Sequence, residues 1–454
     1  MSATSVSVNL EQVAADAVER ARAAGATGAE CTITEGDEFS VSVRMREIES
    51  LKEAGSRAAG IRVLVGQRTG SSYTSDLSPD GIAKMVHAAM DLAKVTTEDP
   101  HAGLPEPQRL GKISEDLRLY DENVEKLESG KRIAMAEDAE RAALDFDPRI
   151  SNSEGAGFSS YAGRRAFANS LGFVGGYRLS SCGLSVSPVA KEGDSMERDY
   201  WYSAARAFAN LDRPEVVGRK AAERALRRLN PRKPLTQKAP VIFEPRTAQA
   251  LLGDLFDAVN GSAIYKHASF LTGKLGEKIA ADCITIVDDA TIPGLFGSTP
   301  FDDEGVVSQR TVVVENGVLK NYLLNSYTAR KLGMKSTGNA SRGITGNAGV
   351  GPGNFFLEAG SKSPGDILKS ISRGLYVTEL IGGGGDTVTG DFSSGAAGLW
   401  IENGELAYPV SEITIAGNLK QMLMEIEAVG SDLEFRTSIA APTLLIREMT
   451  ISGQ

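Results

Sequence analysis

Apolar and polar residues follow two different patterns along this chain. Residues 1–230 combine stretches of helical periodicity with strand-like runs, whereas residues 241–454 contain mainly short apolar runs separated by turn residues. Residues 231–240 lie between the two parts and include three prolines, which is typical of a linker. The pattern predicts an α+β protein, with an N-terminal helix-and-sheet domain, a proline-rich linker, and a mainly antiparallel β C-terminal domain carrying one docked helix.

The N-terminal part is predicted to alternate helices with strands. Ser78 and Pro79 indicate a helix start, because serine caps a helix and proline fits its first turn. Asp212 and Glu215 resemble a capping box that opens another helix. The predicted helices are 10–24, one starting at 79, 124–144, and one ending at 229. The predicted strands are 31–34, 39–44, 60–65, 159–169, 175–186 and 198–210.

The clearest pattern of the C-terminal part is a helix over 246–260, whose apolar residues recur at helical spacing and predict a core-facing stripe. Asp254 and Asp257 share its opposite face. Two carboxylates so placed could hold a hard cation or act as an acid–base pair, and the alternative is a solvated face. Glu-Asn-Gly sequences at 315–317 and 402–404 predict hairpin turns, and a short helix is expected over 367–372.

Composition and charge narrow the classes of function. The 41% hydrophobic and 24% charged residues are ordinary for a globular protein. The 49 basic and 59 acidic residues give a formal charge of −10, which argues against a nucleic-acid binder that relies on attraction to phosphates. The sequence shows neither a signal peptide nor an apolar run long enough for a membrane span, so we expect a cytoplasmic protein. Cys31, Cys182 and Cys283 are widely spaced and are expected to be buried thiols.

The usual catalytic motifs are missing from the sequence. It has three histidines, and none lies within five positions of another, so no two-histidine zinc motif is present. His87 is expected to border an apolar helix stripe and His101 to lie in a solvated loop, which leaves His267 as the best candidate for a functional histidine. Neither a Gly-x-Ser-x-Gly elbow nor a phosphate-binding loop occurs.

Two groups of charged residues each have two interpretations. A basic stripe on the predicted helix ending at 229 could bind an acidic partner, or it could be a solvated face paired with Glu223. It consists of Lys220, Arg224, Arg227 and Arg228. Two acidic clusters beside turns could bind Ca²⁺, but they lack the EF-hand frame and are better explained as turn-forming residues. They are Asp288-Asp289 and Asp302-Asp303-Glu304.

Glycine is concentrated between residues 338 and 398, where it accounts for 16 of 61 positions. Such a segment can turn sharply and expose backbone donors and acceptors, which suits the binding of an extended peptide. The residues that we expect to contact a peptide or to order these loops are Asn339, Arg342, Thr389, Gly390, Asp391 and Phe392.

A series of short motifs in the C-terminal half resembles the TldD/PmbA family, and most closely its PmbA branch, also called TldE. The likeness extends over essentially the whole chain and is densest from residue 241 onward. The motifs are Asp288-Asp289, Ile292-Pro-Gly294, Gly297-Ser298, Phe301-Asp-Asp-Glu-Gly305, Ser336-Thr-Gly-Asn-Ala340, Thr389-Gly-Asp-Phe-Ser393, Gly398-Leu-Trp-Ile-Glu-Asn-Gly404, Tyr408-Pro-Val-Ser-Glu412 and Thr414-Ile-Ala-Gly-Asn-Leu419.

The resemblance implies a cytoplasmic bacterial metallopeptidase made of two related chains, which cleaves unfolded or modified peptides in a cavity between them. In this family the TldD-type chain carries a His-Glu-x-x-x-His zinc motif. Here Gly253 and Ala258 stand where the histidines would be, and Asp254 stands where the glutamate would be. Glycine and alanine cannot ligate a metal, so the resemblance implies no cofactor and no catalytic residue in this chain, and zinc in a TldD-type partner.

Three functions remain open at this point. The first is the partner subunit of a heteromeric zinc peptidase, with a homodimer possible when the sister chain is missing. The second is a homo-oligomeric, non-catalytic protein that binds peptides or an antitoxin. The third is an autonomous peptidase that uses Asp254, Asp257 or His267. The family has also been labelled a modulator of DNA gyrase, which the acidic charge of this chain does not favour.

Overall fold

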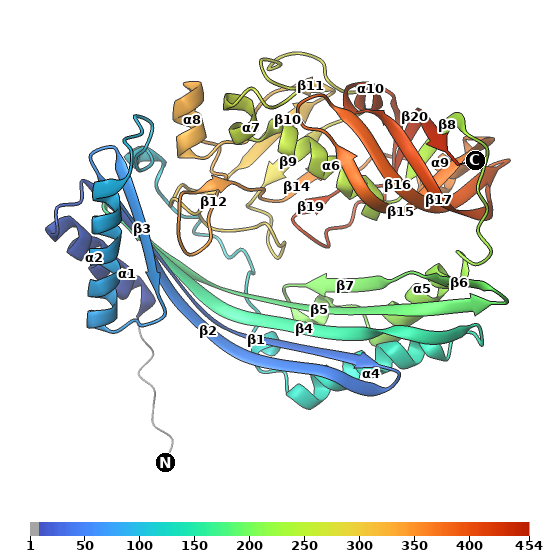
Figure 1. Ribbon diagram of the computed structural model, residues 1–454, viewed down its shortest axis with the longest axis horizontal. Helices are drawn as coiled ribbons and strands as arrows, with labels where there is room; N and C mark the ends of the chain where they lie inside the picture. Colours follow the sequence, from blue (N-terminus) through green and yellow to red (C-terminus); the bar gives the residue numbers. More distant parts are fainter. Residues whose placement is uncertain (1–8, 454) are drawn as a thin grey trace.

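The computed structural model describes residues 9–453 and consists of a long curved sheet beneath a more compact C-terminal β domain (Figure 1). The curved sheet is antiparallel, with the strand order β3-β2-β1-β4-β5-β6, and β7 pairs with β5 beside β6. Its strands are β1 Gly28–Arg44, β2 Glu47–Val65, β3 Arg68–Thr74, β4 Ile150–Asn169, β5 Val174–Glu192, β6 Ser195–Arg198 and β7 Trp201–Ala205.

Helices cover one face of this sheet in two separate groups. On β1, Ile33 at one end and Phe39 and Val41 at the other are buried on one face, whereas Glu35 and Asp37 between them are not, so this face carries two separate apolar patches. One core packs α1 (Leu10–Ala23) and α2 (Pro79–Val95) on one end of the sheet, and the other packs α3 (Glu122–Glu125), α4 (Ser129–Leu144) and α5 (Pro214–Leu226) on the other end. Figure 1 shows the C-terminal domain on the opposite, concave side.

The C-terminal domain contains two larger sheets and one β ribbon. The first sheet has the order β17-β16-β15-β8-β20-β18, and an additional pairing of β17 with β20 joins five of its strands into a ring. The second has the order β11-β10-β9-β14-β19, and β12 pairs with β13. The strands are β8 Gln237–Phe243, β9 Ile286–Asp289, β10 Arg310–Glu315, β11 Val318–Leu319, β12 Ala340–Ser341, β13 Gly349–Val350, β14 Phe355–Leu357, β15 Arg373–Gly385, β16 Asp391–Glu402, β17 Glu405–Asn418, β18 Ile426–Val429, β19 Ile439–Ala440 and β20 Leu444–Ser452.

The helix α6 (Pro245–Val259) packs into the core of this domain through the apolar stripe that the sequence predicts, which includes the buried residues Leu251, Leu255 and Phe256. The remaining helices of the domain are short: α7 Gly261–Tyr265, α8 Ser326–Leu332, α9 Pro364–Lys369 and α10 Leu419–Met424. Short 3₁₀ turns lie at Pro107–Arg109 and Phe208–Asn210. No helix among residues 9–453 is long and apolar enough to cross a membrane.

The predicted fold class, α+β with an N-terminal helix-and-sheet part and a mainly antiparallel C-terminal part, is confirmed. The Ser78 cap is also confirmed, because its side chain accepts the Gly81 N–H. Both Glu-Asn-Gly sequences form hairpin turns, with Asn316 and Asn403 in the left-handed region at φ 47° and 50°. Residues 237–240 of the expected linker form the start of β8, which pairs with β20 there.

Several element predictions were wrong in their details. The short strands predicted over 31–34, 39–44 and 60–65 are parts of the long strands β1 and β2, because the polar stretches between the apolar runs continue the same ladder. The single helix over 124–144 is divided, because Glu128 is extended and Leu127 turns into the core. The strand predicted over 198–210 is interrupted before β7 and ends at Ala205. The capping box is absent, since α5 starts after Arg213 without a side-chain cap.

Candidate functional site

The best candidate for a peptide-contacting surface is the end of the β15–β16 hairpin, residues 381–392, which we call the glycine hairpin. Its strand ladder is irregular between Ile381 and Gly384. Gly382, Gly383 and Gly384 have φ values of 62°, 73° and 137°, which side chains with a Cβ rarely adopt. At Gly383 a Cβ would also lie 2.1 Å from the Ser393 carbonyl oxygen. The glycines are therefore required by the backbone path itself.

Contacts with the C-terminal core fix the position of the glycine hairpin. Asp254 on α6 accepts the Gly385 N–H at 2.9 Å, and the carbonyl of Thr387 accepts the Phe270 N–H at 2.9 Å. Within the loop, Asp386 accepts the N–H groups of Val388 and Thr389 in an Asx turn. The loop is thus exposed but held on both sides.

Asp254 makes a structural contact. The interpretation that it lies on a solvated face is therefore wrong for this residue. Its side chain is half-buried against Gly384 and Gly385, and burial raises the pKa of its carboxyl group, with a smaller contribution from Asp257. Asp257 lies on the surface, where partial loss of solvent around its carboxyl group raises the pKa of that group. The two carboxylates therefore differ in surroundings, and Asp254 is already engaged by a backbone donor.

The predicted residues in the loop divide into exposed and buried ones. Thr389 and Asp391 are exposed, and the Thr389 hydroxyl donates to the Asp391 carboxylate at 3.0 Å, which Asn418 also contacts at 2.9 Å. Gly390 has a φ of 83° and its carbonyl accepts the Leu419 N–H. Phe392 is only 2% exposed and belongs to the core of the domain. Thr389 and Asp391 can touch a ligand, whereas Gly390 and Phe392 shape the loop.

Asn339 and Arg342 lie elsewhere, around β12, and both are buried. Asn339 Nδ2 donates to Asp288 Oδ2 at 2.7 Å. The Arg342 guanidinium pairs with Glu30 of β1 and donates to the Asp303 carbonyl at 2.9 Å. These contacts order the junction between the curved sheet and the C-terminal domain. The six residues singled out in the sequence therefore belong to two separate places in the fold.

The acidic clusters form turns, as the sequence indicates. Asp289 Oδ1 accepts the Thr291 N–H at 2.8 Å, and Asp302 Oδ1 accepts the N–H groups of Glu304 and Val306 at 2.9 Å each. Several of these carboxyl groups are buried. Burial raises the pKa of Asp288 to about 7, and burial together with the neighbouring Glu304 raises that of Asp302 well above its ordinary value.

The α6 positions that the resemblance places opposite the histidines of a zinc motif hold no side chains that could ligate zinc. Gly253 has no side chain and lies in open space, where a Cβ would meet nothing within 4 Å. Ala258 is fully buried in the core, and Asp254 accepts the Gly385 N–H. Across residues 9–453, no group of three or more His, Cys, Asp or Glu side chains is arranged to hold a metal ion.

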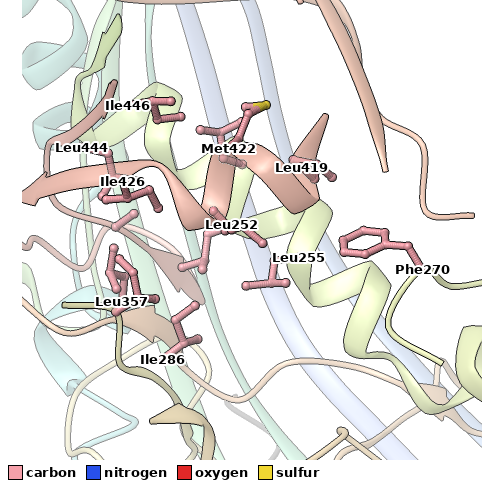
Figure 2. A pocket seen from close by; sticks show the side chains of 14 residues that line it. Leu252, Leu255, Phe270, Ile286, Leu357, Leu419, Met422, Ile426, Leu444 and Ile446 are labelled. Carbon is pink, nitrogen blue, oxygen red and sulfur yellow. The ribbon is translucent and has the colours of Figure 1, made fainter. Parts of the chain in front are cut away.

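An apolar cavity lies beside α6, between this helix and α10 (Figure 2). Its volume is about 30 Å³, and its walls include Leu252, Leu255, Phe270 and Met422. This is room for roughly one or two water molecules, and the apolar walls offer such waters no partners. The cavity is a packing void of the core and cannot accept a peptide side chain.

The predictions for histidines and cysteines need two corrections. His87 is solvent-exposed and pairs with Asp91 at 3.2 Å instead of packing beside the apolar stripe. His267 is exposed on a left-handed backbone with a φ of 54°, at the end of α7. Cys31 and Cys182 are buried as predicted, and burial raises the pKa of both thiols to about 12, whereas Cys283 is exposed.

The arginines of the basic stripe on α5 form neither a solvated face nor a free patch, whereas Lys220 is exposed. Arg224 is buried and pairs with Glu244 at 2.7 Å and with Asp199 at 3.2 Å. Arg228 pairs with Glu379 of β15 at 2.5 Å. The stripe joins the curved sheet and its helices to the C-terminal domain, and the sequence gives no signal for this because the partners are distant along the chain.

Comparison of the chain with models of known protein families assigns all three of its main segments. Three family models match in chain order: PmbA/TldA metallopeptidase domain 1 over residues 29–93, its central domain over 122–229, and its C-terminal domain over 236–453. The chain belongs to the PmbA/TldD metallopeptidase family. This confirms the resemblance that the sequence motifs indicate.

Individual relatives agree with this family membership. Metalloprotease PmbA of Escherichia coli O157:H7 is 43% identical, with 98% of this chain and 96% of the relative covered. A protein of Bacteroides thetaiotaomicron, named as a candidate modulator of DNA gyrase, has a TM-score of 0.90 and 29% identity, covering 98% of this chain and 99% of that one. TldE of Thermococcus kodakarensis has the same fold, with a TM-score of 0.86 at 23% identity over 97% and 100% of the two chains.

Proposed function

We propose that this chain is the TldE-type, non-catalytic subunit of a cytoplasmic zinc peptidase whose TldD-type sister chain carries the metal. The observation that carries the proposal is on α6, where Gly253 and Ala258 offer no ligand atoms and Asp254 is bonded to the Gly385 N–H. The family membership and the names of the relatives support a peptidase activity for the complex. The chain would contribute a peptide-binding surface, and catalysis would occur on the partner.

The glycine hairpin would be this surface. Ile381 and Val388 are 55% and 56% exposed, and the glycines between Ile381 and Asp386 leave the backbone uncovered by side chains. Backbone donors and acceptors can pair with an extended peptide without reading its side chains, which suits unfolded substrates of varied sequence. Thr389 and Asp391 are the side chains that we expect at the rim of this surface.

The test is to measure zinc content and cleavage of an unfolded peptide for this chain alone, for a TldD-type sister chain alone, and for the mixture. We expect zinc in the sister chain only and full cleavage only in the mixture. A homo-oligomer of this chain that binds peptides, with no change in the sister chain's activity, would support the alternative of an independent binding protein. Stoichiometric zinc and cleavage in this chain alone would refute the proposal.

The role of the glycine hairpin can be tested with a matched pair of variants. Asp254→Asn weakens the bond that holds the loop, whereas Asp257→Asn changes the same kind of side chain three residues later at an exposed position. We expect the first to raise KM for an unfolded peptide in the mixture by several-fold, and the second to leave KM within twofold of the wild-type value. Equal effects of the two variants would exclude a role for loop position.

A further inference from the structure

A polar cavity of about 320 Å³ lies where α5, β7 and the start of α6 meet, between the curved sheet and the C-terminal domain. Trp201 and Tyr202 of β7 provide an aromatic wall. Five cationic side chains also line it: Lys220, Arg224, Arg227, Arg246 and Arg436. Three acidic side chains, Glu244, Asp432 and Glu434, complete the charged lining.

Most of these charges are paired with one another, and Lys220 is not. Glu244 pairs with Arg224 at 2.7 Å and with Arg227 at 3.5 Å, and Glu434 pairs with Arg436 at 2.6 Å. The buried Asp199 behind the cavity pairs with Arg224 and Arg246. The Asp432 carboxylate accepts the N–H and hydroxyl of Thr443. Within residues 9–453, Lys220 has no carboxylate oxygen within 4.0 Å of its ammonium group.

The Lys220 ammonium instead lies 3.9 Å from the centre of the Trp201 ring. Arg436, Arg224 and Arg246 lie over the same ring at 4.8 Å, 5.3 Å and 5.9 Å, so four cations gather around one aromatic ring. Burial lowers the pKa of Lys220, and repulsion from Arg436 and Arg224 adds to this effect against the opposing pull of Glu434 and Asp212. The other four cations of the lining pair with carboxylates, so Lys220, which is exposed, is the cation of this lining without an ion-pair partner within residues 9–453.

A second, wider hollow adjoins this cavity, since Tyr202 lines both. It has a volume of about 530 Å³ and lies on the concave face of the curved sheet, which faces the C-terminal domain in Figure 1. Its floor is made of small side chains: Ser40, Gly157, Ser159, Gly183 and Ser185. An extended chain can lie close to such a floor, and its end would then reach the cationic cavity past Tyr202.

We propose that the cavity around Lys220 binds an oxyanion, and that the carboxylate of a peptide lying in the adjoining hollow is its source. A carboxylate would pair with the exposed Lys220 ammonium and accept charge-assisted hydrogen bonds from it. Only the choice of a peptide as the source rests on the proposed function. A free inorganic phosphate presents the same chemistry and is the other possible source.

The test is calorimetric titration of this chain alone with three probes: acetyl-tetraalanine with a free carboxylate, the same peptide as its amide, and inorganic phosphate. The variant is Lys220→Met. The control is Lys131→Met, which also removes an ammonium from the face of an aromatic ring, 4.8 Å from Phe208, but outside the cavity. Circular dichroism checks that both variants fold.

We expect the wild type and Lys131→Met to bind the acid about tenfold more tightly than the amide, which corresponds to about 1.4 kcal/mol. Lys220→Met should reduce this ratio to less than twofold. If the wild type binds phosphate, Lys220→Met does not, and neither prefers the acid to the amide, the oxyanion site is supported and the peptide carboxylate as its ligand is refuted. Two results would overturn the oxyanion site. One is equal affinity for the acid and the amide together with no phosphate binding, and the other is an affinity ratio that Lys220→Met leaves unchanged. No probe requires zinc or the sister chain, so failure of the subunit proposal would leave this result intact.

Discussion

The Asp288 carboxyl group should make the stability of this protein fall as the pH rises towards neutrality. Asp288 is 2% exposed, its Oδ1 has no hydrogen-bond partner within the described chain, and burial raises its pKa from 3.8 to about 7. Between these two values the native state holds a proton that the unfolded state releases. Stability from this group is therefore fully present below about pH 4 and is lost as the pH rises to about 7.

The size of this loss follows from the shift. A change of about 3 pKa units corresponds to roughly 4 kcal/mol, since one unit corresponds to about 1.4 kcal/mol. Asp288→Asn keeps an oxygen that can accept from Asn339 Nδ2 but cannot ionise. The variant should thus be more stable than the wild type at pH 8 by up to about 4 kcal/mol, and the difference should shrink towards zero near pH 4.

Urea unfolding of both proteins at pH steps between 4.5 and 8.5 measures this difference. Asp289→Asn, on the next residue of β9, is the control, and pH dependence that is common to both variants is subtracted. A difference between Asp288→Asn and wild type that stays constant across the pH range would refute the reasoning. It would mean that Asp288 is ionised and paired in the native state.

Three further predictions concern stability and are measured by the same unfolding assay. Gly253→Ala should stabilise the protein by about 0.5–1 kcal/mol, because alanine favours the helix and its Cβ meets nothing within 4 Å; a loss of stability would contradict this. Gly383→Ala should destabilise it by at least about 1 kcal/mol, because the backbone has a φ of 73° and the Cβ would lie 2.1 Å from the Ser393 carbonyl oxygen; an unchanged midpoint would show that the loop can adapt. Arg224→Met should cost about 3–5 kcal/mol, because Glu244 would keep a buried charge without its main partner, whereas Arg219→Met on the exposed face of the same helix should change stability by less than about 0.5 kcal/mol.

The elements with strong local signals were predictable from the sequence. The stripe of α6, the Ser78 cap and the two Glu-Asn-Gly turns depend on neighbours within a few residues, so the pattern alone identifies them. The break between α3 and α4 was not predictable, because it depends on the burial of Leu127 in a core formed by distant strands. The family motifs added what local patterns lack, because their order along the chain indicates the PmbA/TldD metallopeptidase family.

For the candidate site, the sequence identified residue types better than it identified roles. It indicated that the glycine-rich segments form loops, and it showed that α6 has no metal-ligating side chains at positions 253 and 258. It could not show that Asn339 and Arg342 are buried away from the glycine hairpin. Their partners, Asp288 and Glu30, are 51 and 312 residues away along the chain. Burial and partner choice are properties of the assembled fold.

The sequence by itself determined the fold class, the family and the absence of metal-ligating side chains at positions 253 and 258, because these depend on residue identity and on short-range periodicity. Only the tertiary structure decided which charges face water. The basic stripe of α5 reads as a surface feature, yet packing against Glu244 and Asp199 buries most of it and leaves Lys220 as the unpaired cation of a cavity. Charge pairing acts over a few ångströms in space, and only folding brings residues that are distant in the chain within that range.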